Sequence, residues 1–285
     1  MKRSLRWSFV VVVLVACGQL DAIPYQPAQT PDSWLRIQPI VEVPLGASTI
    51  LIVQPSTSII VYVFGLITIG AGVYFLRIKR GQRSRLWWGV ALILWGVGAL
   101  LAGTSYEAFS YHIKCAGRAA CVWTSGWEIA YLVVSAASVD ALLIAQAYAC
   151  AGGRGRRALI GYALINLVVY TSLVLIGTLI PVQFLISFEF LLVAAAPGLV
   201  IMIALNAWRY HKYRQRKDLA LLGTWIWLVL TIAAYFIYYL SGLTQTLWAR
   251  QIWFTENDVL HVGLMGWVIY IVLVVARRVE DEAAP

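Results

Sequence analysis

The chain has 285 residues, of which 61% are hydrophobic and only 12% are charged. Soluble domains carry roughly 45–50% apolar and about 25% charged residues, so this composition excludes an ordinary soluble globular protein. The formal net charge of +9 would suit a nucleic-acid partner, but the basic residues form short clusters between long apolar segments. No zinc-finger, P-loop or dinucleotide-binding motif accompanies them. We therefore expect a membrane protein without a nucleic-acid partner.

The N-terminus has the layout of a bacterial secretory signal peptide, with a basic start followed by the apolar stretch 9–16. Two processing sites are open. The segment that ends in Cys17 is similar to the lipobox of bacterial lipoproteins, in which Cys17 would be lipidated, and Leu20-Asp21-Ala22 would serve for ordinary cleavage. A short uncleaved anchor is the remaining alternative. We expect residues 1–22 to be the signal peptide.

Residues 23–57 contain six prolines, which argue against regular structure throughout this segment. Two short β-branched runs, 40–43 and 48–53, flank Pro44-Leu45-Gly46 and predict a small β-hairpin. We expect this segment to form an extracytoplasmic cap.

Seven apolar segments follow, each long enough to cross a hydrocarbon core of about 30 Å as a helix. A helix satisfies its own backbone hydrogen bonds in lipid. The predicted fold is therefore an all-α bundle of seven transmembrane helices over residues 58–278, followed by a short solvated tail at 279–285. The predicted spans are 58–76, 86–106, 127–149, 158–180, 184–207, 219–242 and 259–276.

The charge of the linkers predicts how these helices are oriented. Fifteen Lys and Arg lie in one alternating set of linkers and at the end of the last span, and four lie in the other set. Because cytoplasmic linkers are enriched in basic residues, we expect the N-terminus outside and the C-terminus inside. The predicted location is the bacterial inner membrane, as a multi-pass protein.

Two cysteines share one predicted outer linker. Cys115 and Cys121 are close in sequence, and an oxidising compartment favours a disulfide between them. Cys150 lies at the predicted cytoplasmic side and is expected to be a free thiol.

Ionisable residues inside membrane spans cost about 2.5–3.5 kcal/mol each on insertion scales, so each is a candidate functional residue. The candidate catalytic residues lie near the predicted outer ends of three spans and are Glu107, Glu128, Asp258 and His261. Three of them, Glu128, Asp258 and His261, are also candidate metal ligands. The alternative is structural: the acids would be solvated boundary residues, and His261 a neutral core histidine.

Two further acids, Glu189 and Asp140, are expected to be buried within spans. Glu189 should lie about 9 Å below the outer end of its helix, and Asp140 about 18 Å deeper than Glu128 along the same helix. Asn166 and Thr231 are the candidate partners of Asp140. Buried acids of this kind suit a path for protons or a solute.

The order of the helices, a Ser-rich end to the second, an acid opening the third and a His opening the seventh resemble the superfamily of alkaline ceramidases and adiponectin/progestin-type receptors. The resemblance implies a zinc ion held by one His on the second helix and a His-x-x-x-His pair on the seventh, with a Ser and an acid completing the site. Ser105 corresponds to the Ser and Glu128 to the acid. His261 matches the second His of the pair, whereas Asn257 and Phe109 stand where the other two are expected.

One His in place of three disfavours zinc, and a carboxylate-rich site would suit a harder divalent metal such as calcium or manganese. Three functions are open. The chain could be a metal-dependent hydrolase of membrane lipid in the outer leaflet, a proton- or solute-coupled carrier or receptor-like protein, or a non-catalytic assembly or structural protein. Membrane lipid is the expected partner, and a protein partner is left open.

Overall fold

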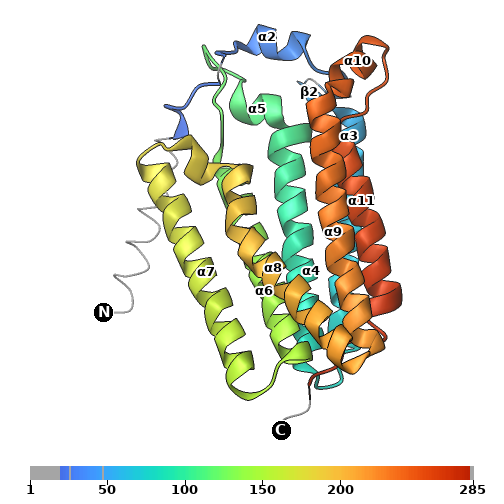
Figure 1. Ribbon diagram of the computed structural model, residues 1–285. Helices are drawn as coiled ribbons and strands as arrows, with labels where there is room; N and C mark the ends of the chain where they lie inside the picture. The colour runs from blue at the N-terminus through green and yellow to red at the C-terminus, as the bar shows by residue number, and fades with distance from the viewer. Residues whose placement is uncertain (1–19, 26, 47, 283–285) are drawn as a thin grey trace.

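The computed structural model describes residues 20–25, 27–46 and 48–282, so Cys17 and most of the predicted signal peptide lie outside the described residues. The described chain forms long helices and one small hairpin (Figure 1). In chain order the elements are α2 (Pro31–Arg36), β1 (Ile40–Leu45), β2 (Ser48–Val53), α3 (Pro55–Arg77), α4 (Arg83–Ala102), η1 (Gly103–Ala108), α5 (Ser110–Lys114), α6 (Gly126–Cys150), α7 (Gly153–Leu179), η2 (Gln183–Ile186), α8 (Phe188–Tyr213), α9 (Arg216–Ser241), α10 (Leu243–Ala249), α11 (Glu256–Tyr270) and η3 (Ile271–Val275).

Within the described residues, seven helices are long and apolar enough to cross a membrane, which confirms the predicted number of spans. They are α3, α4 continued by η1, α6, α7, α8, α9 and α11 continued by η3. We call the end of the bundle that carries α5 and the hairpin the disulfide end, and the opposite end, where α3, α6 and α8 finish, the basic end. The disulfide end is at the top of Figure 1.

Six of these helices form a closed ring. Neighbours in contact run from α3 to α4, α6, α8, α9 and α11, and back to α3. The seventh, α7, packs mainly on the outer side of α6 (Figure 1). The interior of this six-helix ring holds a cavity.

Glycines allow α3 and α4 to approach each other closely. A Cβ atom added to Gly72 would lie 2.7 Å from the carbonyl oxygen of Gly89, and one added to Gly65 would lie 3.1 Å from that of Gly96. Small residues at facing positions let two helix backbones come together in a membrane, where van der Waals packing drives association. This side of the ring is therefore closed tightly.

The predicted hairpin is present at the disulfide end. Strands β1 and β2 pair antiparallel, with Ile40 opposite Val53 and Leu45 opposite Ser48. Gly46 turns the chain with a φ of 62°, a conformation that glycine adopts without steric cost. The Leu51 N–H donates to Nε2 of His112 at 3.1 Å, which ties the hairpin to α5.

The fifth span begins four residues later than predicted, at Phe188 rather than 184. The residues before it form the 3₁₀ turn η2, and the Ser187 hydroxyl caps α8 by accepting from the Phe190 N–H at 3.2 Å. Glu189 consequently lies in the first turn of α8 and is exposed, so the expectation that it is a buried acid was wrong. A carboxylate in this turn is favoured by the helix dipole.

The described part of the C-terminal tail, residues 279–282, was expected to be solvated and is instead folded against the basic end. Its Asp281 carboxylate accepts from the N–H groups of Arg83 and Ser84, at 2.8 and 2.7 Å. Helix α4 has no side-chain cap from its preceding residue, Gln82, so Asp281 satisfies N–H groups that the helix leaves free. Gln82 in turn accepts from the Asp281 N–H at 2.7 Å.

Glu282 continues this attachment. Its carboxylate accepts from Arg209 at 2.9 Å and from Lys217 at 3.2 Å, and its carbonyl accepts from Arg156 at 2.9 Å. The tail thereby joins α7, α8 and α9 at the basic end.

Glu282→Gln is expected to lower the free energy of unfolding by about 1 kcal/mol at neutral pH. Burial acts to raise the pKa of Glu282, but Lys217 and Arg209 outweigh it and hold the pKa below its ordinary value. A carboxyl whose pKa is lowered in the folded state stabilises above its unfolded pKa, and this contribution is lost as the pH falls through the folded pKa. In detergent, the variant should therefore unfold at a lower temperature than the native protein at neutral pH. This difference in unfolding temperature should narrow as the pH falls from about 6 to about 3.

Glu280→Gln is the matched control, because the Glu280 side chain is 67% exposed and lies 3.6 Å from Arg85. Glu280→Gln should change the free energy of unfolding little at any pH. If the difference in unfolding temperature between Glu282→Gln and the native protein stayed constant over the whole pH range, it would contradict the contacts of Glu282 with Arg209 and Lys217.

Candidate functional site

A cavity of about 520 Å³ lies inside the six-helix ring. Small-molecule sites in proteins commonly measure about 300–1,000 Å³ and combine apolar walls with a few polar groups. The walls here are largely apolar and aromatic, and all six helices of the ring contribute to them. The polar lining comes mainly from the disulfide-end half of the helices and consists of Glu107, Asn257, His261, Ser135 and the tyrosines Tyr106, Tyr131 and Tyr235.

Glu107 reaches the cavity from the π-helical segment η1, which continues α4. Such wide turns inside helices are frequent at functional sites. The side chain is buried, and its Oε1 accepts from the Asn257 amide at 2.8 Å. Its Oε2 is also buried and has no hydrogen-bond partner among the described residues. A buried carboxylate oxygen without a partner is costly, so this atom is the most informative feature of the cavity.

His261 lies one turn along α11 from Asn257. Its Nδ1 is 2.6 Å from the Asn257 carbonyl oxygen. A carbonyl can only accept, so Nδ1 carries the proton, and in the neutral ring Nε2 is then an acceptor. The ring packs against Phe64 with centroids 5.5 Å apart. His261 therefore adds a second acceptor to the polar part of the cavity.

Glu128 does not line the cavity and is paired with Lys114. It forms a buried ion pair with Lys114, and both side chains are 2% exposed. Its Oε1 also accepts from the Ser105 hydroxyl at 2.8 Å. The Lys114 ammonium additionally lies 4.8 Å from the centre of the Tyr106 ring, a cation–π contact. Burial acts to lower the pKa of Lys114, but Glu128 outweighs it and raises the pKa above its ordinary value, so the ammonium group stays charged.

Asp258 stabilises the start of its own helix. Its Oδ2 accepts from the Thr255 N–H at 2.7 Å, and the Thr255 hydroxyl accepts from the Asp258 N–H at 3.4 Å. This reciprocal pair is a capping box. Asp258 does not line the cavity, so of the four candidate catalytic residues the structure brings only Glu107 and His261 to it.

The candidate metal ligands are not brought together. Across the described parts of the chain, no three His, Cys, Asp or Glu side chains form a group that could hold a metal ion. Asn257, which stands where the resemblance implies a His, donates to Glu107, and Glu128 is paired with an ammonium group that would repel a cation. These residues do not fit the zinc site that the resemblance implied.

Asp140 is buried where α6 faces α7 and does not line the cavity. Both of its carboxylate oxygens accept from the Asn166 amide, at 3.1 and 3.2 Å. Asn166 is one of its two expected partners. The other, Thr231, lies instead against Gly263 on α11.

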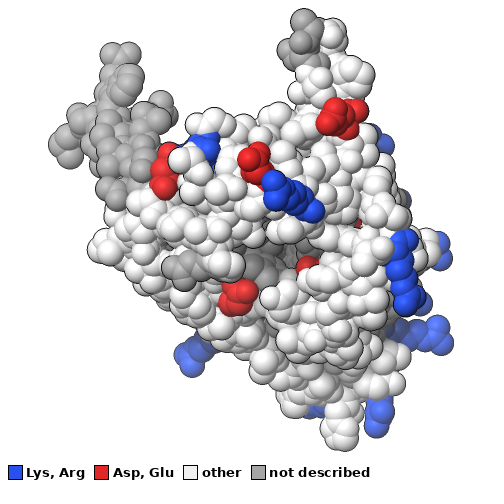
Figure 2. All heavy atoms as spheres, turned by 90° about the horizontal axis from the view of Figure 1, so that it is seen from above, with Lys and Arg blue, Asp and Glu red and all other residues white. Residues whose placement is uncertain are grey.

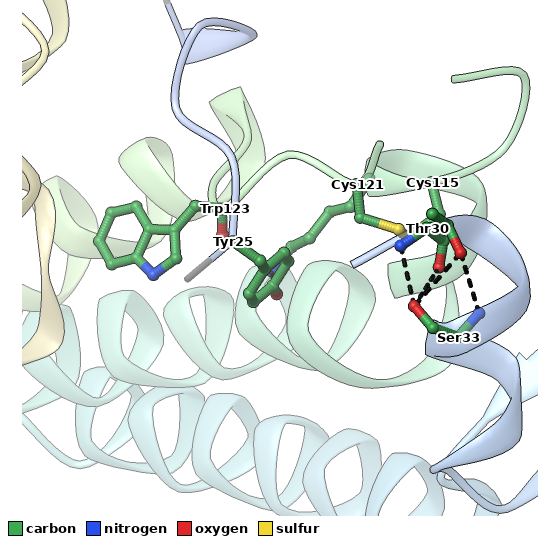
Figure 3. The surroundings of a disulfide bond; sticks show 7 residues. Tyr25, Thr30, Ser33, Cys115, Cys121 and Trp123 are labelled. Carbon is green, nitrogen blue, oxygen red and sulfur yellow. Dashed lines mark hydrogen bonds between the residues drawn. A yellow bond between two sulfur atoms is a disulfide. The ribbon is translucent and has the colours of Figure 1, made fainter. Parts of the chain in front are cut away.

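The disulfide between Cys115 and Cys121 is present, as predicted (Figure 3). It packs against Trp34 of α2, and the adjoining Tyr25 hydroxyl accepts from Lys114 at 3.2 Å. Cys150 is a free cysteine, as expected, but it is buried and donates to Asn206 at 3.5 Å. The disulfide thus holds the loop beside the buried Lys114–Glu128 pair.

The part of the cavity wall formed by α8 and α9 includes residues that are exposed at the surface. These helices are joined near the basic end by Arg209 and Asp218, 2.8 Å apart, and they diverge toward the disulfide end (Figure 1). Two residues that line the cavity on this side, Ala196 and Val229, are exposed. Seen from the disulfide end, the molecular surface is also hollowed near its middle, and an acidic side chain is visible in the hollow (Figure 2).

Comparison with protein families matches residues 57–280 to DUF6962, a family of unknown function. Comparisons with curated proteins and with solved structures each give no match. None of these comparisons links the chain to the ceramidase and receptor superfamily.

Proposed function

The chain belongs to the DUF6962 family of unknown function, and we propose that it is a receptor-like or carrier-like protein that binds a small amphiphilic molecule within its helix ring. The chain is a multi-pass membrane protein with seven apolar helices. The observation that carries the proposal is the cavity of about 520 Å³, in which apolar walls surround a buried carboxylate oxygen without a partner.

The two parts of the cavity suit the two parts of an amphiphile. Its apolar part would lie against residues such as Trp95, Trp225 and Leu264, where burial contributes roughly 25 cal/mol per Å² of apolar surface. Its polar end would meet Glu107 and His261, which fix its orientation. The exposed cavity residues between α8 and α9 offer a route from the lipid phase.

We propose further that the disulfide end lies outside the cytoplasm, in the bacterial inner membrane. The basic linkers at the opposite end support this orientation, because such linkers are retained in the cytoplasm. The polar end of the cavity would then lie in the outer half of the bilayer.

Ligand binding is favoured over the two other functions by particular contacts. A metal-dependent hydrolase would require ligands that here are used elsewhere, in the Lys114–Glu128 pair and the Asp258 capping box. A purely structural protein would have no need of a cavity of this size with a carboxyl group at its polar end.

Ala195→Phe is expected to weaken binding of the co-purifying amphiphile roughly tenfold or more, because the added ring would occupy the cavity that Ala195 lines. The protein would be purified from membranes into nanodiscs, and its bound small molecules extracted and quantified by mass spectrometry. Val193→Phe is the matched control, since Val193 is on the same helix and 59% exposed. Native protein without a stoichiometric amphiphile, or equal occupancy in Ala195→Phe, would overturn the proposal.

A further inference from the structure

The polar end of the cavity presents acceptors in excess of donors. Glu107 Oε2 is without a partner among the described residues, and the neutral His261 ring presents Nε2 as an acceptor. One N–H of the Asn257 amide is already used by Glu107 Oε1. The tyrosine hydroxyls that line the cavity can both donate and accept. With Glu107 in its carboxylate form, this end is complemented by a ligand that donates hydrogen bonds.

The charges around Glu107 favour a positively charged ligand. Asp258 and Glu256 on α11 act on it as like charges. The cation that acts on it, Lys114 on α5, is already paired with Glu128. A buried carboxyl group without a compensating cation takes up a proton, and a cation bound beside it restores the charged form. The site thus has room for one positive charge that the described residues do not supply.

We infer that the ligand is a single-chain amphiphile with a primary amine, and that the protonated amine donates to Glu107 and His261 while the chain lies along the apolar wall. This inference rests on the proposed binding function and specifies the chemical class of its ligand. A protonated amine supplies both properties that the site requires, a positive charge and several N–H donors. An alcohol supplies only the donor, and a carboxylate adds a repelled charge.

The experiment compares four probes of equal chain length on the full protein in phosphatidylcholine nanodiscs at neutral pH. Dodecylamine, dodecanol, dodecanoic acid and dodecyltrimethylammonium would be titrated and their dissociation constants measured by thermal shift. Dodecylamine is expected to bind at least tenfold more tightly than dodecanol, and dodecanoic acid more weakly than both. Dodecyltrimethylammonium, a cation without N–H donors, should bind more weakly than dodecylamine.

Glu107→Gln should weaken dodecylamine binding roughly 10- to 100-fold and dodecanol binding by a much smaller factor, because the Gln carbonyl still accepts from a hydroxyl but carries no charge. Glu189→Gln is the matched control, because it removes an exposed carboxylate at the same end of the bundle and should leave the preference intact. Retained dodecanol binding shows that Glu107→Gln is folded. If that variant does not fold, the native protein still tests the amine inference, which requires that dodecylamine bind more tightly than dodecyltrimethylammonium.

The outcomes separate the two proposals. If none of the four probes binds, the proposed binding function fails, and the inference fails with it. If dodecanol or dodecanoic acid binds as tightly as dodecylamine, or if Glu107→Gln keeps the amine preference, binding stands and the amine inference is overturned. Equal binding of dodecyltrimethylammonium and dodecylamine would likewise overturn it, because N–H donors would then contribute nothing.

Discussion

Lys114→Met is expected to lower the free energy of unfolding by about 3–5 kcal/mol, because it leaves the Glu128 carboxylate buried without its cation. Both side chains of the pair are 2% exposed, so water cannot replace the lost partner. The remaining donor, the Ser105 hydroxyl, carries no charge. The loss should appear as a lower midpoint of chemical unfolding in detergent.

Two comparisons isolate the cause. The double variant Lys114→Met with Glu128→Gln should recover much of the lost stability, since no charge is then left buried alone. Arg118→Gln is the matched control: Arg118 forms a solvent-exposed pair with Asp21, at 3.0 Å, and its loss should cost about 1 kcal/mol or less. Equal effects of Lys114→Met and Arg118→Gln would show that the buried pair does not stabilise the disulfide end.

Arg209→Met should have an effect of the same size, about 3–5 kcal/mol, at the basic end. The buried guanidinium donates to Asp218 at 2.8 Å, to the Cys150 carbonyl at 2.8 Å and to Glu282 at 2.9 Å. Without it, Asp218, which is fully buried, would be left without its cation. Helices α6, α8 and α9 and the tail would lose their common contact.

Two measurements report this loss. Unfolding in detergent gives its size, and maleimide labelling of Cys150, which is buried beside the network, gives the local opening. Labelling should be faster in Arg209→Met than in the native protein. Arg214→Gln, at an exposed position just beyond α8, is the control and should change neither. Unchanged labelling and stability in Arg209→Met would contradict the assigned network.

The sequence was sufficient to predict the features that depend on local pattern. Seven apolar stretches predicted seven helices, because span length and hydropathy are properties of contiguous residues. The β-branched runs around Pro44 and Gly46 predicted the hairpin, and the spacing of Cys115 and Cys121 predicted their disulfide.

Features that depend on distant partners could not be predicted in this way. The tail was expected to be solvated because its run of acids is short and charged, yet Asp281 caps a helix whose first residues are 198 positions away. Glu128 was grouped with His261 because both lie near the same end of the bundle. Its actual partner, Lys114, sits in a linker where nothing in the local sequence marks it as buried.

The candidate site was predicted only in part for the same reason. Sequence position indicated that Glu107 and His261 lie at the same end, and the structure places both at one cavity. Sequence position could not indicate that Asn257 links Glu107 and His261, since this link depends on how η1 turns toward α11. The late start of α8 depends on the turn η2, which apolar composition alone did not distinguish from helix.

The most direct measurement is a cryo-electron microscopy map of the protein purified from membranes into nanodiscs. We expect elongated density inside the ring of α3, α4, α6, α8, α9 and α11, with its polar end within hydrogen-bonding distance of Glu107 and His261. A map in which side chains close this space, or in which lipid density is confined to the outer surface of the ring, would contradict an amphiphile-binding function.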